Sequence, residues 1–216
     1  IELFDPKEFW TLSVQFNDND KNSILASITQ LNDKQIKKFS FKGKAEIDKA
    51  MEEVKSKKFN INDISSKVVN RNPSGPFTTS TLQQVSSGRL GFGASRTMQI
   101  AQKLYQGIEI DGETIGLITY MRTDGTNLST DAIDTFRKYI KNEFGDEYVP
   151  DNAASYSGKK AKNAQEAHEA IRPTDIMRAP DTVKKYLSPD QHKLYDLIWS
   201  RALSSQMKPA QFDRNT

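Results

Sequence analysis

The stretch Gly116-Leu-Ile-Thr-Tyr-Met-Arg-Thr-Asp124 begins with apolar residues and ends in residues that favour a turn. Its apolar, β-branched start predicts a short buried strand over residues 113–120. Tyr120 and Arg122 are two positions apart, so in an extended chain their side chains point to the same face. We therefore expect a tyrosine hydroxyl and a guanidinium side by side at the end of a strand.

A helix is predicted directly after this stretch. Ser129 is a plausible N-cap, and apolar residues recur at helical spacing from Ala132 to Phe144. The N-terminus of a helix suits an anion, because its first backbone N–H groups have no partner within the helix.

This pairing allows nucleophilic chemistry on a phosphodiester. A free tyrosine loses its proton only near pH ~10, so a tyrosine nucleophile needs help in losing it. A neighbouring guanidinium gives that help and also neutralises the phosphodiester under attack. A structural interpretation stays open, in which Tyr120 covers the core with its hydroxyl at the surface and Arg122 is a solvated charge.

Composition limits the class of protein. The 216 residues include no Cys and 2 His, which excludes disulfides and Cys-ligated zinc, and we predict no metal site. No apolar run approaches ~20 residues and no signal peptide is visible, so we expect a cytoplasmic protein without a membrane partner. The chain starts without Met and ends in what reads as the beginning of a strand, which indicates a fragment of a longer protein.

The charge distribution favours a polyanionic partner, although the net charge is only +3. Residues 64–108 contain no Asp or Glu but several cations, of which Arg89 and Arg96 are our candidates for DNA binding. A chance run on a mildly basic protein is the alternative. Lys159 and Lys160, in a loop-like segment, are further candidates for phosphate contacts or else simply solvated.

The chain predicts an α+β fold in two domains. Residues 1–72 consist mostly of strand-like segments with one helix near 45–54, and we expect residues 208–216 to return to this domain as a strand. Prolines and a glycine in residues 70–76 mark the boundary. Residues 73–207 form the second, mainly helical domain.

The second domain is predicted to begin with a winged-helix-like unit. Two helices, near residues 79–87 and 95–106, flank a glycine turn, and Asp111-Gly112 favours a type I′ hairpin turn directly after them. The second strand of that hairpin would then carry Tyr120. Further helices are expected over residues 181–187 and 189–207.

A short helix is also predicted over residues 164–171, ending before Pro173. His168 and Arg172 would share one face of it. Without further information, a histidine interacting with the dipole at a helix C-terminus explains this pattern equally well.

Three strings together resemble the type IA DNA topoisomerases of bacteria, in the order in which that family has them. They are Ile118-Thr-Tyr-Met-Arg-Thr-Asp124, Gln165-Glu-Ala-His-Glu-Ala-Ile-Arg-Pro-Thr174 and Pro76-Phe-Thr-Thr-Ser-Thr-Leu-Gln-Gln84. The resemblance is weakest in residues 1–65, and Gly125 stands where many members have Ser.

The resemblance implies that Tyr120 is a nucleophile that breaks a single-stranded DNA segment and becomes linked to its 5′ phosphate, without ATP. Arg122 would stabilise that phosphate, His168 would position or protonate groups near it, and Arg172 would contact the backbone. It also implies a monomer that relaxes negatively supercoiled nucleoid DNA, and it identifies residues 1–72 as part of a β-rich arch. Magnesium would be bound by an acidic domain of the same polypeptide that is absent here, which leaves no cofactor for this fragment.

Two alternatives remain at this point. Tyrosine recombinases and type IB topoisomerases form a 3′-phosphotyrosine, but their His-x-x-Arg pair precedes the tyrosine, whereas His168 and Arg172 follow Tyr120 with three residues between them. A winged-helix DNA-binding module without catalysis is the other.

Overall fold

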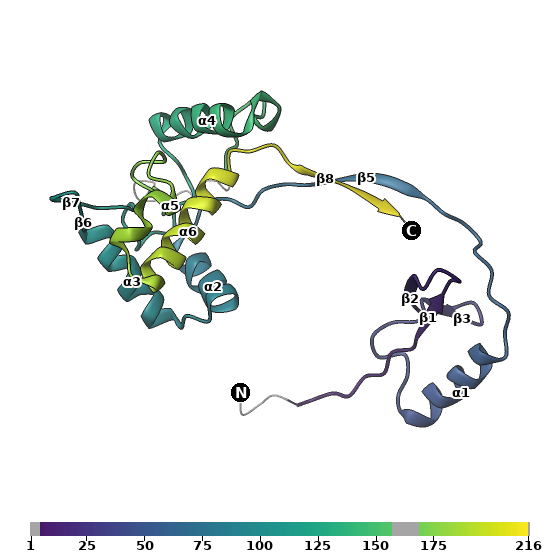
Figure 1. Ribbon diagram of the computed structural model, residues 1–216. Coiled ribbons are helices and arrows are strands. Elements are labelled where there is room, and N and C mark those ends of the chain that lie inside the picture. Colours follow the sequence, from purple (N-terminus) through teal and green to yellow (C-terminus); the bar gives the residue numbers. More distant parts are fainter. Residues whose placement is uncertain (1–4, 157–168, 216) are drawn as a thin grey trace, which may run out of the picture. The chain divides into compact units, whose positions relative to one another are not determined.

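The computed structural model describes residues 5–156 and 169–215, and the chain divides into two compact units, Ile1–Ile64 and Ser65–Thr216 (Figure 1). Each unit combines α-helix with small antiparallel sheets, so the fold is α+β, as the sequence predicts. No helix in the described ranges is long and apolar enough to cross a membrane.

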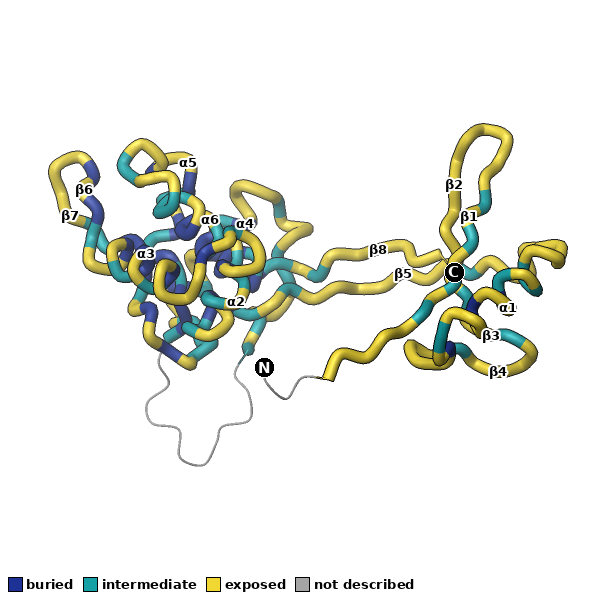
Figure 2. Tube along the Cα trace, turned by 90° about the horizontal axis from the view of Figure 1, so that it is seen from below, coloured by how far each residue is buried: buried dark blue, intermediate teal, exposed yellow. Residues whose placement is uncertain are grey.

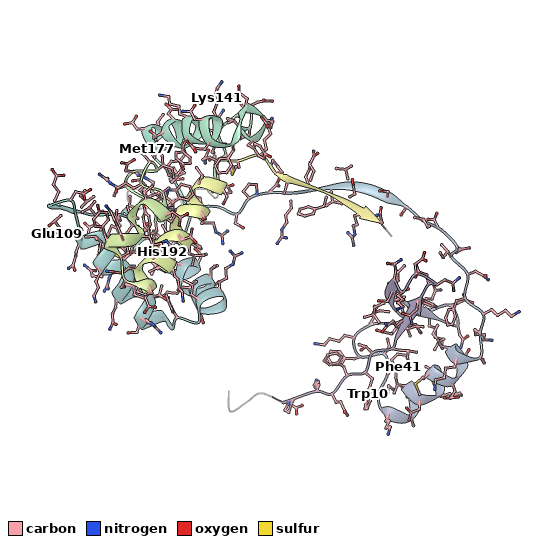
Figure 3. The ribbon with its side chains drawn as sticks, viewed as in Figure 1. Trp10, Phe41, Glu109, Lys141, Met177 and His192 are labelled. Carbon is pink, nitrogen blue, oxygen red and sulfur yellow. The ribbon has the colours of Figure 1, made fainter. Side chains whose placement is uncertain are left out.

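The described residues of the first unit form two antiparallel hairpins and one helix. Their bounds are β1 (Ser13–Asn17) with β2 (Ser23–Ser27), β3 (Gln30–Leu31) with β4 (Lys34–Gln35), and α1 (Lys44–Lys55). Phe41, Ile47 and Ala50 form its small core, and Trp10 packs against them. Figure 3 shows Trp10 and Phe41 on neighbouring segments of this unit.

The strands of this unit are shorter than its strand-like sequence predicts. Residues 1–72 were expected to be mostly strand-like, but of residues 35–39 only Gln35 is in a strand, β4, and of residues 59–69 only those from Ser66 onward are. Alternating composition was present in both segments, but most of their apolar side chains, such as Phe39 and Ile61, are exposed. Nothing in the described part of the unit buries them, so the pattern alone does not make a strand.

The second unit carries the larger core, coloured dark blue in Figure 2. Its elements are β5 (Ser66–Arg71), α2 (Thr79–Leu90), α3 (Ala94–Gln106), β6 (Ile108–Ile110), β7 (Glu113–Ile115), α4 (Thr130–Phe144), η1 (Asp146–Tyr148), α5 (Pro180–Val183), η2 (Lys184–Tyr186), α6 (Pro189–Ser204) and β8 (Ala210–Asn215). Fully buried residues of α6, among them Leu194, Tyr195 and Ile198, belong to this core together with the apolar faces of α2, α3 and α4.

Local sequence signals explain most helix ends of this unit. Ser129 caps α4 as expected, and Ser188 forms a capping box at the start of α6, where Pro189 is the first helical residue. Thr78 caps α2, which begins at Thr79 and extends to Leu90, three residues beyond the predicted end at residue 87. Asp111 and Gly112 both have positive φ, as the predicted type I′ turn between β6 and β7 requires.

The C-terminal segment is extended, as predicted, and pairs with β5. The register of β5 with β8 runs from Ser66↔Asn215 to Arg71↔Ala210, antiparallel, and both strands are exposed along their whole length. This ribbon belongs to the second compact unit. Its assignment, with residues 1–72, to an arch domain stays a prediction.

The expected strand through Tyr120 is wrong. β7 ends at Ile115, because its partner β6 begins at Ile108 and the residue before that strand, Gly107, closes α3. The chain then crosses the end of α3, where Leu117 donates a backbone hydrogen bond to Leu104, and makes only a single β-bridge, between Ile118 and Pro173.

The expected helix over residues 164–171 is also wrong for its described part, Glu169 to Ile171. This segment is extended, with β-bridges from Glu169 to Asn127 and from Ile171 to Phe77. Backbone hydrogen bonds to segments distant in sequence outweigh the local helical pattern here. Residues 164–168 lie outside the described ranges.

Candidate active site

The segment that carries Tyr120 alternates between buried and exposed side chains. Met121 is 1% exposed and Thr123 7%, whereas Tyr120 is 48% exposed and Arg122 is also exposed. The period of two that the sequence predicted therefore holds, although the backbone forms no strand. Among the described residues, neither the Tyr120 hydroxyl nor the Arg122 guanidinium has a hydrogen-bond or ion-pair partner.

Threonine hydroxyls attach this segment to residues 170–174 on one side. The Thr119 hydroxyl donates to the carbonyl of Ala170 at 2.7 Å and accepts from the backbone N–H of Arg172 at 3.0 Å. The Thr174 hydroxyl donates to the carbonyl of Gly116 at 2.7 Å. The residue before Tyr120 is thus fixed by both its backbone and its side chain.

On the other side, the start of α2 fixes the residues around Arg122. The Thr79 hydroxyl donates to the carbonyl of Met121 at 2.8 Å and accepts from the backbone N–H of Thr123 at 2.8 Å. The backbone N–H of Thr79 donates to the carbonyl of Thr123 at 2.9 Å. Tyr120 and Arg122 are therefore exposed side chains on a rigidly held backbone, which is how a reactive group is kept in position.

Glu169 connects the segment of residues 169–174 with the start of α4. Its carboxylate accepts two hydrogen bonds from the Arg172 guanidinium, at 2.6 and 3.1 Å, and one from the backbone N–H of Ser129 at 3.0 Å. Burial, the largest influence, raises the pKa of Glu169, but the hydrogen bonds and charge of Arg172 and the N–H of Ser129 together bring that pKa below its ordinary value.

A cavity of about 290 Å³ opens beside the tyrosine. It is lined by Tyr105, Thr119, Tyr120, Thr123 and Glu169. The rings of Tyr105 and Tyr120 meet edge to face, with 5.3 Å between their centroids. The segment with the candidate nucleophile, the end of α3 and the segment after His168 thus meet at one place.

The structure describes only part of the predicted site. Tyr120, Arg122 and Arg172 belong to the segments around the cavity, but the Arg172 side chain is only 15% exposed and is held by Glu169. His168, Lys159 and Lys160 lie outside the described residues, so their predicted roles stay predictions.

The two arginines of the acid-free stretch differ. Arg96 pairs with Asp190 at 2.5 Å and lies over the ring of Phe92, so its charge is already compensated. Arg89 is exposed, and no carboxylate among the described residues pairs with it. Arg201, which the sequence did not single out, lies near Arg89. Burial and that neighbouring charge lower the pKa of Arg201, whose guanidinium stacks on Phe77 at 4.6 Å.

Several positions of this site escaped the sequence reasoning. Thr79 and Thr119 were part of the quoted strings, but their partners lie about 40 to 50 positions away in sequence, at separations of 42 and 51 residues for their carbonyl acceptors. Tyr105 lies within the helix predicted near residues 95–106, where nothing in the sequence singled it out. Only the three-residue spacing of Glu169 and Arg172 was a local signal, and the helix predicted there obscured its meaning.

Among residues 5–156 and 169–215, no three His, Asp or Glu side chains gather into a group that could hold a metal ion.

Comparison with known proteins identifies the class. A family model described as "DNA topoisomerase" matches residues 1–216. The curated DNA topoisomerase 1 of Rickettsia bellii is 47% identical over 208 residues, which is 96% of this chain and 26% of that protein. DNA topoisomerase 1 of Haemophilus influenzae is 44% identical over 216 residues, 100% of this chain and 23% of that protein.

A solved structure supports the same family. Full-length topoisomerase I from Thermotoga maritima matches with a TM-score of 0.75 at 38% identity, covering 100% of this chain and 32% of that chain. The chain belongs to the bacterial type IA DNA topoisomerases, the family that its three sequence strings resemble. It spans about a quarter of the length of the curated relatives it matches.

Proposed function

We propose that this chain is the DNA-cleaving part of a longer type IA topoisomerase, which breaks, passes and rejoins DNA strands to relax negative supercoils without ATP. The observation that carries the proposal is the exposed Tyr120 beside a cavity, on a backbone fixed by Thr79 and Thr119. We expect such an enzyme to act on chromosomal DNA in the bacterial cytoplasm.

The proposed cleavage step is a transesterification. The Tyr120 hydroxyl loses its proton and its oxygen bonds to the phosphorus, while the bond from phosphorus to the 3′ oxygen breaks and that oxygen takes up a proton. The 5′ phosphate stays on the tyrosine, so the number of phosphoester bonds is unchanged and the 3′ hydroxyl can reverse the reaction. This balance explains why no nucleotide cofactor is needed.

Charged side chains assist this step in distinct ways. Arg122, exposed and without a carboxylate partner in the described ranges, is proposed to neutralise the phosphate as charge develops on it. His168 is proposed to position or protonate groups near that phosphate. Arg172 is already paired with Glu169, so we propose that it contacts the DNA backbone from this fixed position.

Other parts of the longer protein must complete the reaction. Magnesium, in this proposal, is held by an acidic domain outside this chain. We therefore expect the isolated chain to bind single-stranded DNA weakly and not to relax supercoiled plasmid. The chain is proposed to act as a monomer.

The proposal is tested with Tyr120→Phe in the longer polypeptide. We expect this variant to lose strand cleavage and relaxation while it keeps its affinity for a single-stranded oligonucleotide, because only the attacking oxygen is removed. Tyr148→Phe is the matched control, since Tyr148 is 47% exposed and also makes an edge contact, with Phe144. If the Tyr120→Phe variant cleaved DNA normally, the proposal would be wrong. The chain would then be a DNA-binding module without catalysis, in which Tyr120 is structural.

A further inference from the structure

Tyr105 has no role in the chemistry proposed above, yet it forms one wall of the cavity next to the nucleophile. It lies in the last turn of α3 and is 41% exposed. Its ring and that of Tyr120 meet at an interplanar angle of 64°, so they do not lie flat on one another. This arrangement leaves aromatic surface of the pair open to the solvent rather than buried in the core.

The other walls of the cavity suit a flat, uncharged ring. Its volume of about 290 Å³ lies just below the range for ligand pockets, roughly 300–1,000 Å³, and suits a small ligand. Thr119 and Thr123 contribute short side chains, and their hydroxyls are engaged in hydrogen bonds, including Gly125 N–H to Thr123 at 3.0 Å. The Glu169 carboxylate accepts hydrogen bonds from Arg172 and Ser129, so this side chain forms a wall of the cavity and does not act as a free charge.

We propose that Tyr105 is the stacking platform of a nucleobase subsite, which takes the base of a nucleotide flanking the scissile phosphate. The inference rests on the proposed function, since it is Tyr120 that brings the phosphate to this cavity. Bases stack on tyrosine irrespective of their identity, because each base has a π face. The subsite therefore holds the strand in register for attack without selecting a sequence.

The nucleobase subsite is tested by a double-mutant cycle that combines a substitution of Tyr105 with the removal of one base from the DNA. The longer polypeptide is given single-stranded oligonucleotides that contain an abasic site at each of the two positions flanking the cleaved bond, in turn, and the dissociation constant is measured. For the wild type we expect one of the two abasic sites to weaken binding about tenfold, within the range typical of one base stacked on an aromatic ring. Tyr105→Ala should weaken binding of the intact oligonucleotide by a similar factor and make the protein insensitive to that abasic site.

Three further variants make the result decisive. Tyr105→Phe keeps the ring and should behave as the wild type, whereas Tyr105→Leu keeps apolar volume without an aromatic face and should behave as Tyr105→Ala. Tyr148→Ala, at an exposed tyrosine elsewhere in the same unit, should leave binding of both the intact and the abasic oligonucleotide unchanged.

The subsite is refuted if Tyr105→Ala and the abasic site each weaken binding and their factors on the dissociation constant multiply. The base would then not be stacked on Tyr105, and Tyr105 would only support the ring of Tyr120. The subsite is equally refuted if neither abasic site weakens binding by the wild type. Either result leaves covalent cleavage by the wild type intact. Absence of any covalent product with the wild type would instead contradict the proposed function itself.

Discussion

At the scale of single residues, the site depends on side chains that alternate between exposed and buried, although the backbone that carries them forms no strand. Tyr120 and Arg122 are exposed, whereas Met121 and Thr123 between and after them are buried. The spacing of the two polar residues predicted this shared face from sequence alone. What holds the backbone in place could not be predicted, because the hydroxyl of Thr79 acts on residues more than 40 positions away.

The Thr79 hydroxyl provides the first prediction. Thr79→Val removes the donor to Met121 and the acceptor for the N–H of Thr123, and leaves these partly buried backbone groups unsatisfied. We expect a loss of about 1–3 kcal/mol in the free energy of unfolding, measured by urea titration of this chain, and slower cleavage in the longer protein. Thr79→Ser keeps the hydroxyl and should restore both; equal stability of the Val variant and the wild type would contradict the role of this hydroxyl.

Glu169 provides a prediction about pH. Its pKa in the folded chain lies below the ordinary value of 4.5, so the stability it contributes is fully present above that value and is lost as the pH falls through the lower, folded-state pKa. Glu169→Gln should therefore be less stable than the wild type at pH 7, and the difference should shrink below about pH 4. Urea unfolding between pH 7 and pH 3 measures it, and a difference independent of pH would argue against the ion pair.

At the scale of elements, the sequence predicted correctly those helices and turns that depend on neighbouring residues. It predicted wrongly the segments whose structure depends on residues distant in sequence. Capping residues and the Asp111-Gly112 turn predicted α4, α6 and the β6–β7 hairpin, since each depends on neighbours in sequence. The helix predicted up to Ile171 failed because the backbone of its described residues pairs with two distant segments, at Phe77 and at Asn127. The same long-range bonds bring Arg172 to Thr119, so the site was predictable only as separate motifs.

Gly116, where the chain crosses the end of α3, gives an element-scale prediction. A Cβ atom at this position would lie 2.7 Å from the carbonyl oxygen of Tyr105, which is backbone and cannot move aside alone. We expect Gly116→Ala to destabilise the chain by about 1–3 kcal/mol and to slow cleavage by displacing the segment of Tyr120.

Gly88→Ala is the matched control for that substitution. Gly88 lies within α2, and a Cβ atom there would meet nothing within 4 Å. Because alanine favours a helix over glycine, this variant should be as stable as the wild type or up to about 1 kcal/mol more stable in thermal unfolding. If both glycine variants behaved alike, close packing at Gly116 would not be the cause.

At the scale of the whole molecule, the two compact units differ in the size of their cores. In the described residues, the buried core of the first unit is Phe41, Ile47 and Ala50, whereas the second unit buries large parts of several helices. The domain limits drawn from sequence, at residues 70–76, rested on prolines and a glycine. Those residues mark where a chain can turn, but not which unit the neighbouring ribbon of β5 and β8 packs with.

This difference predicts unequal stability of the two units. Amide protons of α1, which buries only Ile47 and Ala50, should exchange with solvent faster than those of α6, which has buried residues from Leu194 to Leu203. Hydrogen exchange followed by mass spectrometry of the intact chain measures this directly. Equal protection of the two helices would show that the chain unfolds as one cooperative body.

The central claim is that the Tyr120 oxygen forms the covalent bond to DNA, and trapping that bond tests it most directly. The longer polypeptide is denatured during cleavage of a single-stranded oligonucleotide, and the attached peptide and DNA end are identified by mass spectrometry and by digestion with end-specific nucleases. We predict that the peptide with Tyr120 carries the DNA through its 5′ phosphate. Attachment at another residue, or through a 3′ phosphate, would contradict the account.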